Sequence, residues 1–178
     1  MIILVGYVSI EGQSKKIAET VAAQIEKGGD RAVLFNVVTG AEYGVDHPQA
    51  VILCAPIHAG RYPAPFVDFV ERERDWLKSV PSAFVSVSLF IRSEFAEERE
   101  EAMHFPDALM AQTGWKPGMV HHAAGALRYT EYDFFKRWMA KRLAEREGAP
   151  TDVKQIHEFT DWTALEGFTK EFLAAAKA

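Results

Sequence analysis

Five short apolar runs divide the chain, and each is nearly continuous. They cover residues 2–8, 31–38, 50–55, 83–89 and 118–126. Runs of this length without polar alternation are typical of strands that are buried on both faces of a parallel sheet. The pattern therefore predicts a central sheet of five parallel strands.

Segments with helical periodicity lie between these runs and after them. Ile17, Val21 and Ile25 recur at every fourth position before a Gly-Gly pair at 28–29, which is expected to end that helix. Three further helices are expected at residues 64–78, 94–113 and 161–177. Pro106 is expected to break the second of these three.

The regular alternation of strands and helices predicts an α/β fold with a doubly wound, five-stranded parallel sheet. Helices on both faces and the flavodoxin-like strand order 2-1-3-4-5 fit this rhythm. We expect a single domain over residues 1–178. We also expect a helical insert at 127–150, after strand five, because this stretch is longer than a connecting loop requires.

The composition excludes several classes of protein. The chain has 178 residues, 48% hydrophobic and 25% charged, which is typical of a folded globular protein. Its one cysteine, Cys54, excludes an intramolecular disulfide framework, indicates a reducing compartment and is expected to lie in the core. The net charge of −5 argues against nucleic-acid binding. No apolar run approaches the ~20 residues of a membrane span, so we expect a cytoplasmic protein.

The loop after the first strand carries the first candidate chemistry. Ser9 and Ser14 supply hydroxyl groups, and Gly12 lets backbone N–H groups approach an anion at the start of the next helix. The loop lacks the Gly-Lys-Ser/Thr of a P-loop and the Gly-x-Gly-x-x-Gly of a dinucleotide-binding turn. It therefore indicates either a phosphate-binding loop or an ordinary strand–helix turn capped by a serine.

This loop, Ser9-Ile10-Glu11-Gly12-Gln13-Ser14, resembles the FMN-phosphate motif of flavodoxins, with Glu11 in place of the middle hydroxyl residue. Further stretches extend the resemblance to one flavodoxin-like family, the bacterial menaquinone-dependent protoporphyrinogen IX dehydrogenases. They are Ala-Pro-Ile-His-Ala-Gly-Arg-Tyr at 55–62, Pro-Ser-Ala-Phe-Val-Ser-Val-Ser-Leu at 81–89, Ala-Gly-Ala-Leu-Arg-Tyr at 124–129 and Thr-Asp-Trp at 160–162. Gly-Ala-Leu-Arg-Tyr is the most specific of these, because generic flavodoxins lack it.

The resemblance implies an FMN-dependent oxidoreductase that oxidises protoporphyrinogen IX to protoporphyrin IX in heme biosynthesis, with menaquinone as the quinone acceptor. Three loops would hold the FMN. The expected cofactor-binding residues are Ser9, Glu11, Gly12, Gln13, Ser14, Ile57, His58, Ala59, Gly60, Arg61, Tyr62, Ser88 and Leu89. On the substrate side we expect Arg92, Arg128 and Tyr129. The sequence nominates no catalytic acid or base.

Several of these side chains have a second interpretation. Tyr62 either stacks on the flavin or packs on the helix that follows it. Arg61 and Arg92 either meet the flavin and an acidic substrate or are solvated surface residues. His121 and His122 indicate no metal site, because adjacent strand residues point to opposite faces of a sheet.

The insert has a pattern of its own. Its apolar residues follow helical spacing, and six Lys or Arg against four Asp or Glu give residues 127–150 a net charge of +2. The residues expected at its membrane or partner face are Phe135, Trp138, Met139 and Arg142. A basic aromatic helix at 131–147 either lies on anionic lipid at the inner face of the plasma membrane or covers a large apolar substrate. The remaining interpretation is a helix packed on its own domain or in a homodimer.

Other functions remain open at this stage. The chain is alternatively an NAD(P)H-dependent quinone or FMN reductase, since flavodoxin-like reductases often lack a nicotinamide-binding motif. A third interpretation is a flavodoxin-type electron carrier, although such carriers are usually more acidic than this chain. The fourth is a domain that has lost its flavin, which the acidic side chain of Glu11 suggests.

Overall fold

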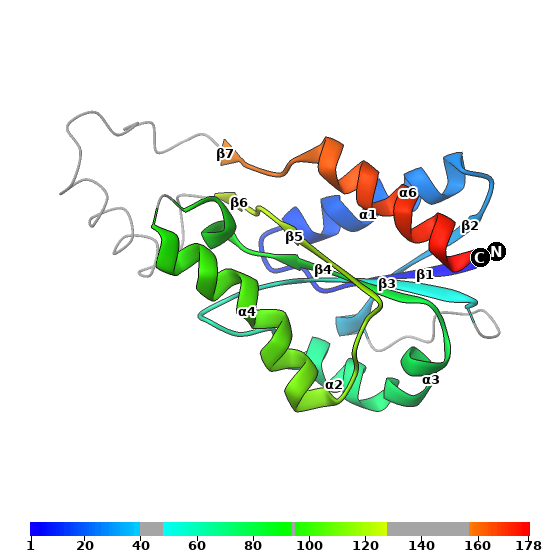
Figure 1. The fold of residues 1–178 in the computed structure, drawn as a ribbon, viewed down its shortest axis with the longest axis horizontal. Helices are drawn as coiled ribbons and strands as arrows, with labels where there is room; N and C mark the ends of the chain where they lie inside the picture. The colour runs from blue at the N-terminus through cyan, green and yellow to red at the C-terminus, as the bar shows by residue number, and fades with distance from the viewer. Residues whose placement is uncertain (40–47, 94, 128–156) are drawn as a thin grey trace.

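A five-stranded parallel sheet forms the centre of the molecule (Figure 1), in a computed structural model that describes residues 1–39, 48–93, 95–127 and 157–178. The strands are β1 (Ile2–Tyr7), β2 (Arg31–Asn36), β3 (Ala50–Pro56), β4 (Ser82–Val87) and β5 (Met119–Ala123). Their order is β2-β1-β3-β4-β5 and every pair is parallel. The predicted fold class and strand order are confirmed.

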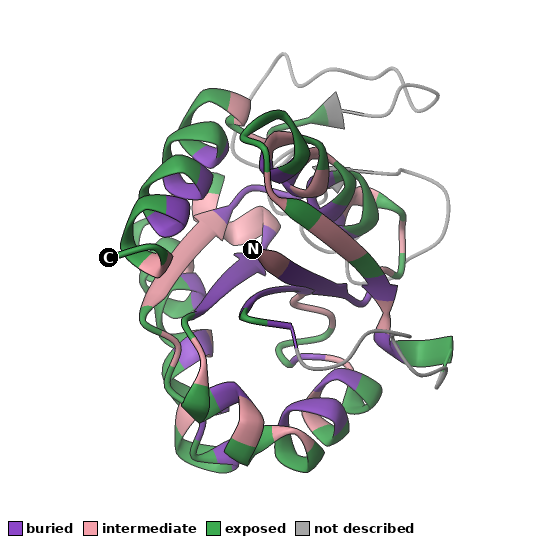
Figure 2. Ribbon diagram, turned by 90° about the vertical axis from the view of Figure 1, so that its right-hand side faces the viewer, coloured by how far each residue is buried: buried purple, intermediate pink, exposed green. Residues whose placement is uncertain are grey.

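Helices cover both faces of the sheet, so its central strands are buried (Figure 2). One layer holds α1 (Gln13–Lys27) and α6 (Trp162–Ala176), and the other holds α2 (Ala64–Arg72), α3 (Arg74–Ser79) and α4 (Ala96–Thr113). Strand β3 serves both layers, because Ile52 and Cys54 face α1 and α6, whereas Val51, Leu53 and Ala55 face α2 and α4. A strand used on both faces has no polar alternation, which explains the continuous apolar runs.

Helix α1 ends at the predicted glycine pair. Gly29 adopts a positive φ of 85°, and the N–H of Asp30 donates to the carbonyl of Ile25 at 3.2 Å. This geometry is a Schellman-type helix end, and the left-handed conformation in it favours glycine. The Asp30 carboxylate then pairs with the N-terminal amine at 2.9 Å and with Lys177 at 2.6 Å, which joins the end of α1 to α6.

Two helix predictions need correction. The helix expected at 64–78 is divided at Glu73 into α2 and α3. The break expected at Pro106 does not occur, because α4 runs through it from Ala96 to Thr113. A proline inside a helix removes one backbone hydrogen bond and costs about 3 kcal/mol. Burial along the face that carries Ala102, Pro106, Leu109 and Thr113 offsets this cost.

The predicted fifth strand is also shorter than expected. β5 ends at Ala123, and the chain then enters a separate two-stranded antiparallel sheet of β6 (Ala126–Leu127) and β7 (His157–Glu158). The carbonyl of Gly125 accepts a hydrogen bond from the N–H of Phe159 at 3.3 Å. Gly125 therefore pairs with the segment that follows β7 and not with β4. The remainder of the predicted insert, residues 128–150, lies outside the described residues.

Candidate functional site

The loops that follow β1, β3, β4 and β5 gather at one edge of the sheet, since parallel strands end on the same side. Three backbone hydrogen bonds continue the strand pairing beyond the strand ends. Val8 N–H donates to Cys54, Ile57 N–H to Val87 and Ser88 N–H to Ala123, at 3.1, 2.8 and 3.0 Å. The sheet itself therefore fixes the start of each loop relative to its neighbour.

Gly12 begins helix α1 and gives this edge an anion-binding character. Its φ of 95° lies in the left-handed region, and its N–H donates to the hydroxyl of Ser9 at 3.0 Å. A glycine has no side chain with which to cap the helix, so this residue leaves the N–H groups of the first turn to an external acceptor. The helix dipole adds partial positive charge at the same place.

The burial and the hydrogen bonds of Ser14 show whether a phosphate would fit at the start of α1. The residue is only 2% exposed, and its carbonyl accepts a hydrogen bond from the thiol of Cys54 at 3.5 Å. Its hydroxyl makes no hydrogen bond with any of the described residues. A nearly buried hydroxyl that the described residues leave without a partner, beside uncapped helix N–H groups, fits a phosphate oxygen. Burial raises the pKa of the Cys54 thiol, so this group remains neutral.

The other two residues of this loop contribute differently. The side-chain amide of Gln13 donates to the hydroxyl of Thr160 at 2.8 Å, so an anion at the start of α1 meets the backbone of Gln13 and not its side chain. Glu11 is half-buried in the same loop. The signal that could have indicated the Gln13 contact is the Thr-Asp-Trp stretch at 160–162, which carried part of the resemblance but received no role.

The loop after β3 is a tight four-residue turn. His58 N–H donates to the carbonyl of Arg61 at 2.9 Å, and Arg61 N–H donates back at 3.2 Å. Between them Ala59 and Gly60 adopt positive φ values of 49° and 76°, which is the geometry of a type I′ turn. Ala59, Gly60 and Arg61 are exposed, so the turn presents backbone and a guanidinium group at the edge of the site.

In the structure Tyr62 packs on the helix that follows it, which is the second of its two interpretations, and its contact with a flavin stays a prediction. Its ring is 7% exposed and packs between Phe66 and Phe84, with ring centroids 5.9 and 5.3 Å away. Its hydroxyl lies 2.7 Å from that of Ser86, and burial raises its pKa. The ring belongs to the apolar layer beneath the loop. Ile57 is half-buried and packs against the same layer.

The loop after β4 is a 3-10 helix, η2 (Leu89–Arg92), whose first turn Ser88 caps. The Ser88 hydroxyl accepts a hydrogen bond from the N–H of Phe90 at 3.2 Å, and the residue is nearly buried. Leu89 lies beside Gly125, where an added Cβ would be 3.7 Å from its Cγ. Arg92 is exposed at the end of η2. This loop therefore meets the segment after β5 on one side and presents a basic side chain on the other.

The chain that returns at β7 completes this edge, and sequence reasoning missed its contribution. Lys16 of α1 pairs with Glu158 at 2.6 Å and lies over the ring of Trp162, 5.1 Å from its centroid. The hydrogen bond from Lys16 holds the pKa of Glu158 below its ordinary value, although burial opposes the shift. The start of α1 is thereby fixed to a segment more than a hundred residues further along the chain.

Apart from Arg92, the residues predicted for the substrate side and for the membrane or partner face are not among the described ones. Arg128, Tyr129, Phe135, Trp138, Met139 and Arg142 lie outside the described residues. His121 packs on Phe168 of α6, with ring centroids 5.1 Å apart, and its neighbour on β5 points to the other face. In the described parts of the chain no three metal-ligating side chains converge, and no described helix has both the length and the apolar character needed to cross a bilayer.

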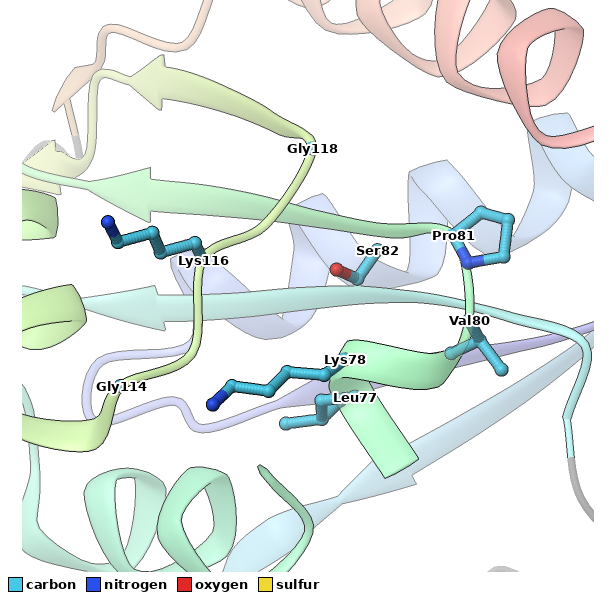
Figure 3. Close-up of a pocket in the computed structure, with 8 residues that line it drawn as sticks. All are labelled: Leu77, Lys78, Val80, Pro81, Ser82, Gly114, Lys116 and Gly118. Atoms are coloured by element: carbon cyan, nitrogen blue, oxygen red, sulfur yellow. The ribbon is translucent and has the colours of Figure 1, made fainter. Parts of the chain in front are cut away.

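A separate pocket of about 490 Å³ lies at the opposite edge of the sheet (Figure 3). Its lining includes Lys78, Ser82, Gly114 and Lys116. Helix α4 ends at Gly114, and cationic side chains at this place complement the carbonyl groups of a helix C-terminus. The two lysines therefore have a structural explanation that is independent of the candidate site.

A parallel sheet with the strand order 2-1-3-4-5 and an uncapped helix start in the loop after β1 defines a flavodoxin-like protein. The chain belongs to the flavodoxin domain family, whose model matches residues 4–154. It is 30% identical over 161 residues to the protoporphyrinogen IX dehydrogenase [quinone] of Escherichia coli K12. The aligned residues cover 90% of this chain and 88% of that protein. It is also 30% identical over 169 residues to the protein of the same name from Leishmania major, which covers 94% and 73%.

Solved structures agree on the fold. An oxidised flavodoxin 1 from Bacillus cereus superposes with a TM-score of 0.55 over 98% of both chains, at 14% identity. A flavodoxin variant from Pseudomonas aeruginosa gives 0.55 over 100% of both chains, also at 14% identity. At this level of identity the likeness concerns the arrangement of the elements.

Proposed function

We propose that the chain is an FMN-dependent enzyme that oxidises protoporphyrinogen IX to protoporphyrin IX and passes the electrons to a quinone. The observation that carries the flavin is the uncapped start of α1, where Gly12 and the hydroxyl of Ser14, which has no hydrogen-bond partner among the described residues, fit a phosphate. The substrate and acceptor rest on the names of relatives that are 30% identical over 90% or more of the chain. Menaquinone is the particular quinone that we expect.

Each loop has one task in this proposal. The hydroxyl groups of Ser9 and Ser14 and the backbone N–H groups of the first turn of α1 hold the phosphate, with Gly12 and Gln13 contributing backbone only. The turn from His58 to Arg61, together with Ile57, Ser88 and Leu89, borders the flavin ring. Glu11 is the remaining residue of the first loop that we expect to contact the FMN. FMN would supply two-electron chemistry, so three cycles, each reducing one quinone, would remove the six hydrogens by which protoporphyrinogen IX differs from protoporphyrin IX. The residues named here would bind the cofactor, orient it and exclude water.

The substrate side rests on basic side chains. Protoporphyrinogen IX is a large apolar molecule with two carboxylates, and Arg92 is exposed at the end of η2, next to the proposed flavin ring. Arg92 and Arg128 would pair with the carboxylates, and Tyr129 would contact the macrocycle. None of these groups is required to act as a proton acceptor in the proposal.

Residues 131–147 are proposed to contact the membrane at its inner face, where the quinone acceptor is dissolved. The support is the basic and aromatic composition of this segment. Flotation with anionic vesicles at low salt should carry the wild-type protein upward, and Trp138→Glu should abolish this. A wild-type protein that stays at the bottom and elutes as a dimer in light scattering would instead support a homodimer surface.

The main experiment measures flavin and turnover in the same preparation. Purified protein should be yellow and should release FMN on denaturation. Under anaerobic conditions it should convert protoporphyrinogen IX to fluorescent porphyrin only when a quinone is added. A protein that binds FMN but accepts electrons from NADPH instead would be a quinone reductase. A colourless protein that FMN fails to titrate would contradict every flavin-dependent function.

A further inference from the structure

The hydroxyl of Thr160 joins two loops of the candidate site. It accepts a hydrogen bond from the side-chain amide of Gln13 at 2.8 Å and donates one to the carbonyl of Ala124 at 2.7 Å. Gln13 is the first residue of α1, and Ala124 directly follows β5. One half-buried hydroxyl therefore connects the start of α1 to the segment that follows β5.

Neighbouring contacts hold Thr160 in this place. Phe159 N–H donates to the carbonyl of Gly125 at 3.3 Å, and β7 pairs with β6 just before it. Asp161 caps α6 by accepting a hydrogen bond from the N–H of Ala164 at 2.9 Å. With backbone pairing on one side and a capped helix on the other, Thr160 is a fixed point against which the start of α1 is held.

The start of α1 needs such support because its own cap supplies none. Gly12 offers no side chain, and glycine gives the backbone more freedom than any other residue. A phosphate that binds to helix N–H groups gains most when those groups already point in the right direction. The contact between Gln13 and Thr160 pre-orders the first turn without occupying its N–H groups.

We propose that Thr160 is a positioning residue: its hydrogen bonds to Gln13 and Ala124 hold the start of α1 in the geometry that binds the FMN phosphate. This inference rests on the proposed function, because it assumes that the phosphate of FMN binds at Gly12 and Ser14. Thr160 itself touches neither the flavin nor the substrate in this proposal.

The test compares FMN with riboflavin, which has the same ring but no phosphate. Thr160→Val removes both hydrogen bonds at nearly constant volume, Thr160→Ser retains the hydroxyl, and Thr163→Val is the matched control on the exposed face of α6. Affinity for each ligand is measured by fluorescence quenching of the purified apoprotein, and thermal unfolding is recorded for every variant.

We expect Thr160→Val to weaken FMN binding about tenfold and to leave riboflavin binding unchanged. Thr160→Ser should recover most of the FMN affinity, and Thr163→Val should match the wild type. Gln13→Leu should weaken FMN binding by a similar factor, and its combination with Thr160→Val should add little further, because both remove the same contact.

Four outcomes would overturn the inference. Equal FMN affinity in Thr160→Val and the wild type would show that the contact does not position the phosphate loop. An equal loss for FMN and riboflavin would indicate a general structural role, as would a Thr160→Ser variant as weak as Thr160→Val. A wild-type protein that binds neither ligand would overturn the proposed function as well, whereas the first three outcomes leave that function standing.

Discussion

The phenolic oxygen of Tyr62 lies 2.7 Å from the hydroxyl of Ser86, inside the apolar layer beneath the candidate site. Each group satisfies the other, since both residues are buried. Tyr62 directly follows the turn from His58 to Arg61 and packs in the apolar layer that supports this turn. Within the turn itself, Ala59 and Gly60 are exposed.

Tyr62→Phe should test this placement. The variant loses one buried hydrogen bond and leaves the Ser86 hydroxyl without its partner, so the free energy of unfolding should fall by about 1–2 kcal/mol in urea titrations. The FMN affinity and the visible spectrum of the bound flavin should stay as in the wild type. A shifted spectrum or a large loss of affinity at unchanged stability would show that the ring contacts the flavin after all.

Gly12→Ala should damage flavin binding through the backbone. At φ 95° an alanine costs roughly 1–2 kcal/mol, and relief of this strain moves the N–H groups that hold the phosphate. Gly29→Ala is the control, because Gly29 has a similar φ of 85° at the other end of α1 and an added Cβ meets nothing within 4 Å. Both variants should unfold at lower temperature, but only Gly12→Ala should lose FMN affinity in titrations.

Ser14→Ala should separate binding from stability. The variant removes a nearly buried hydroxyl that has no partner among the described residues, so the apoprotein should unfold at the same temperature or a higher one. Loss of a hydrogen bond to a charged phosphate should weaken FMN binding by about 10- to 100-fold. Parallel falls in stability and affinity would indicate that the hydroxyl supports the fold instead.

His121 should make the protein sensitive to mild acid. Burial lowers the pKa of His121 below its ordinary value of 6.5, His122 lowers it further, and Asp161 opposes the shift. Below pH 6.5 the unfolded chain therefore binds a proton at His121 more readily than the folded chain does. The folded state loses stability relative to the unfolded state as the pH falls below 6.5, and it keeps that stability above this pH.

His121→Phe should reduce that sensitivity, since phenylalanine keeps a ring against Phe168 and cannot titrate. The unfolding temperature should fall less between about pH 7.5 and about pH 5.5 in the variant than in the wild type. Equal falls in the two proteins would assign the acid sensitivity to other groups.

The fold was predictable because its signals are local and repeated. Buried parallel strands leave continuous apolar runs, and the alternation of strands and helices restricts the topology to few choices. The failures concern tertiary context. Nothing within a few residues of Pro106 shows that the face carrying Ala102 and Leu109 is buried, and this burial keeps α4 continuous.

The candidate site was predictable to a different degree. Gly12 and Ser14 stand out from spacing alone, because a phosphate loop between a strand and a helix is a local structure. The role of Thr160 depends on contacts with Gln13 and Ala124, which are 147 and 36 residues away in the chain. No periodic pattern records such a contact. Tyr62 illustrates a related point, because the sequence does not show whether the ring of an aromatic residue in a loop faces a ligand or packs in the core, where the structure places it.

Leu127 and His157 are paired in register in the β6–β7 ladder, although residues 128–156 separate them in the sequence. Neighbouring positions in such a ladder are close enough to be joined by a two-residue Asn-Gly turn. A turn of this kind could therefore join Leu127 to His157 directly and leave the described strand pairings as they are. A chain shortened in this way should still fold and bind FMN, and its turnover of protoporphyrinogen IX would test whether residues 128–156 carry the proposed substrate contacts.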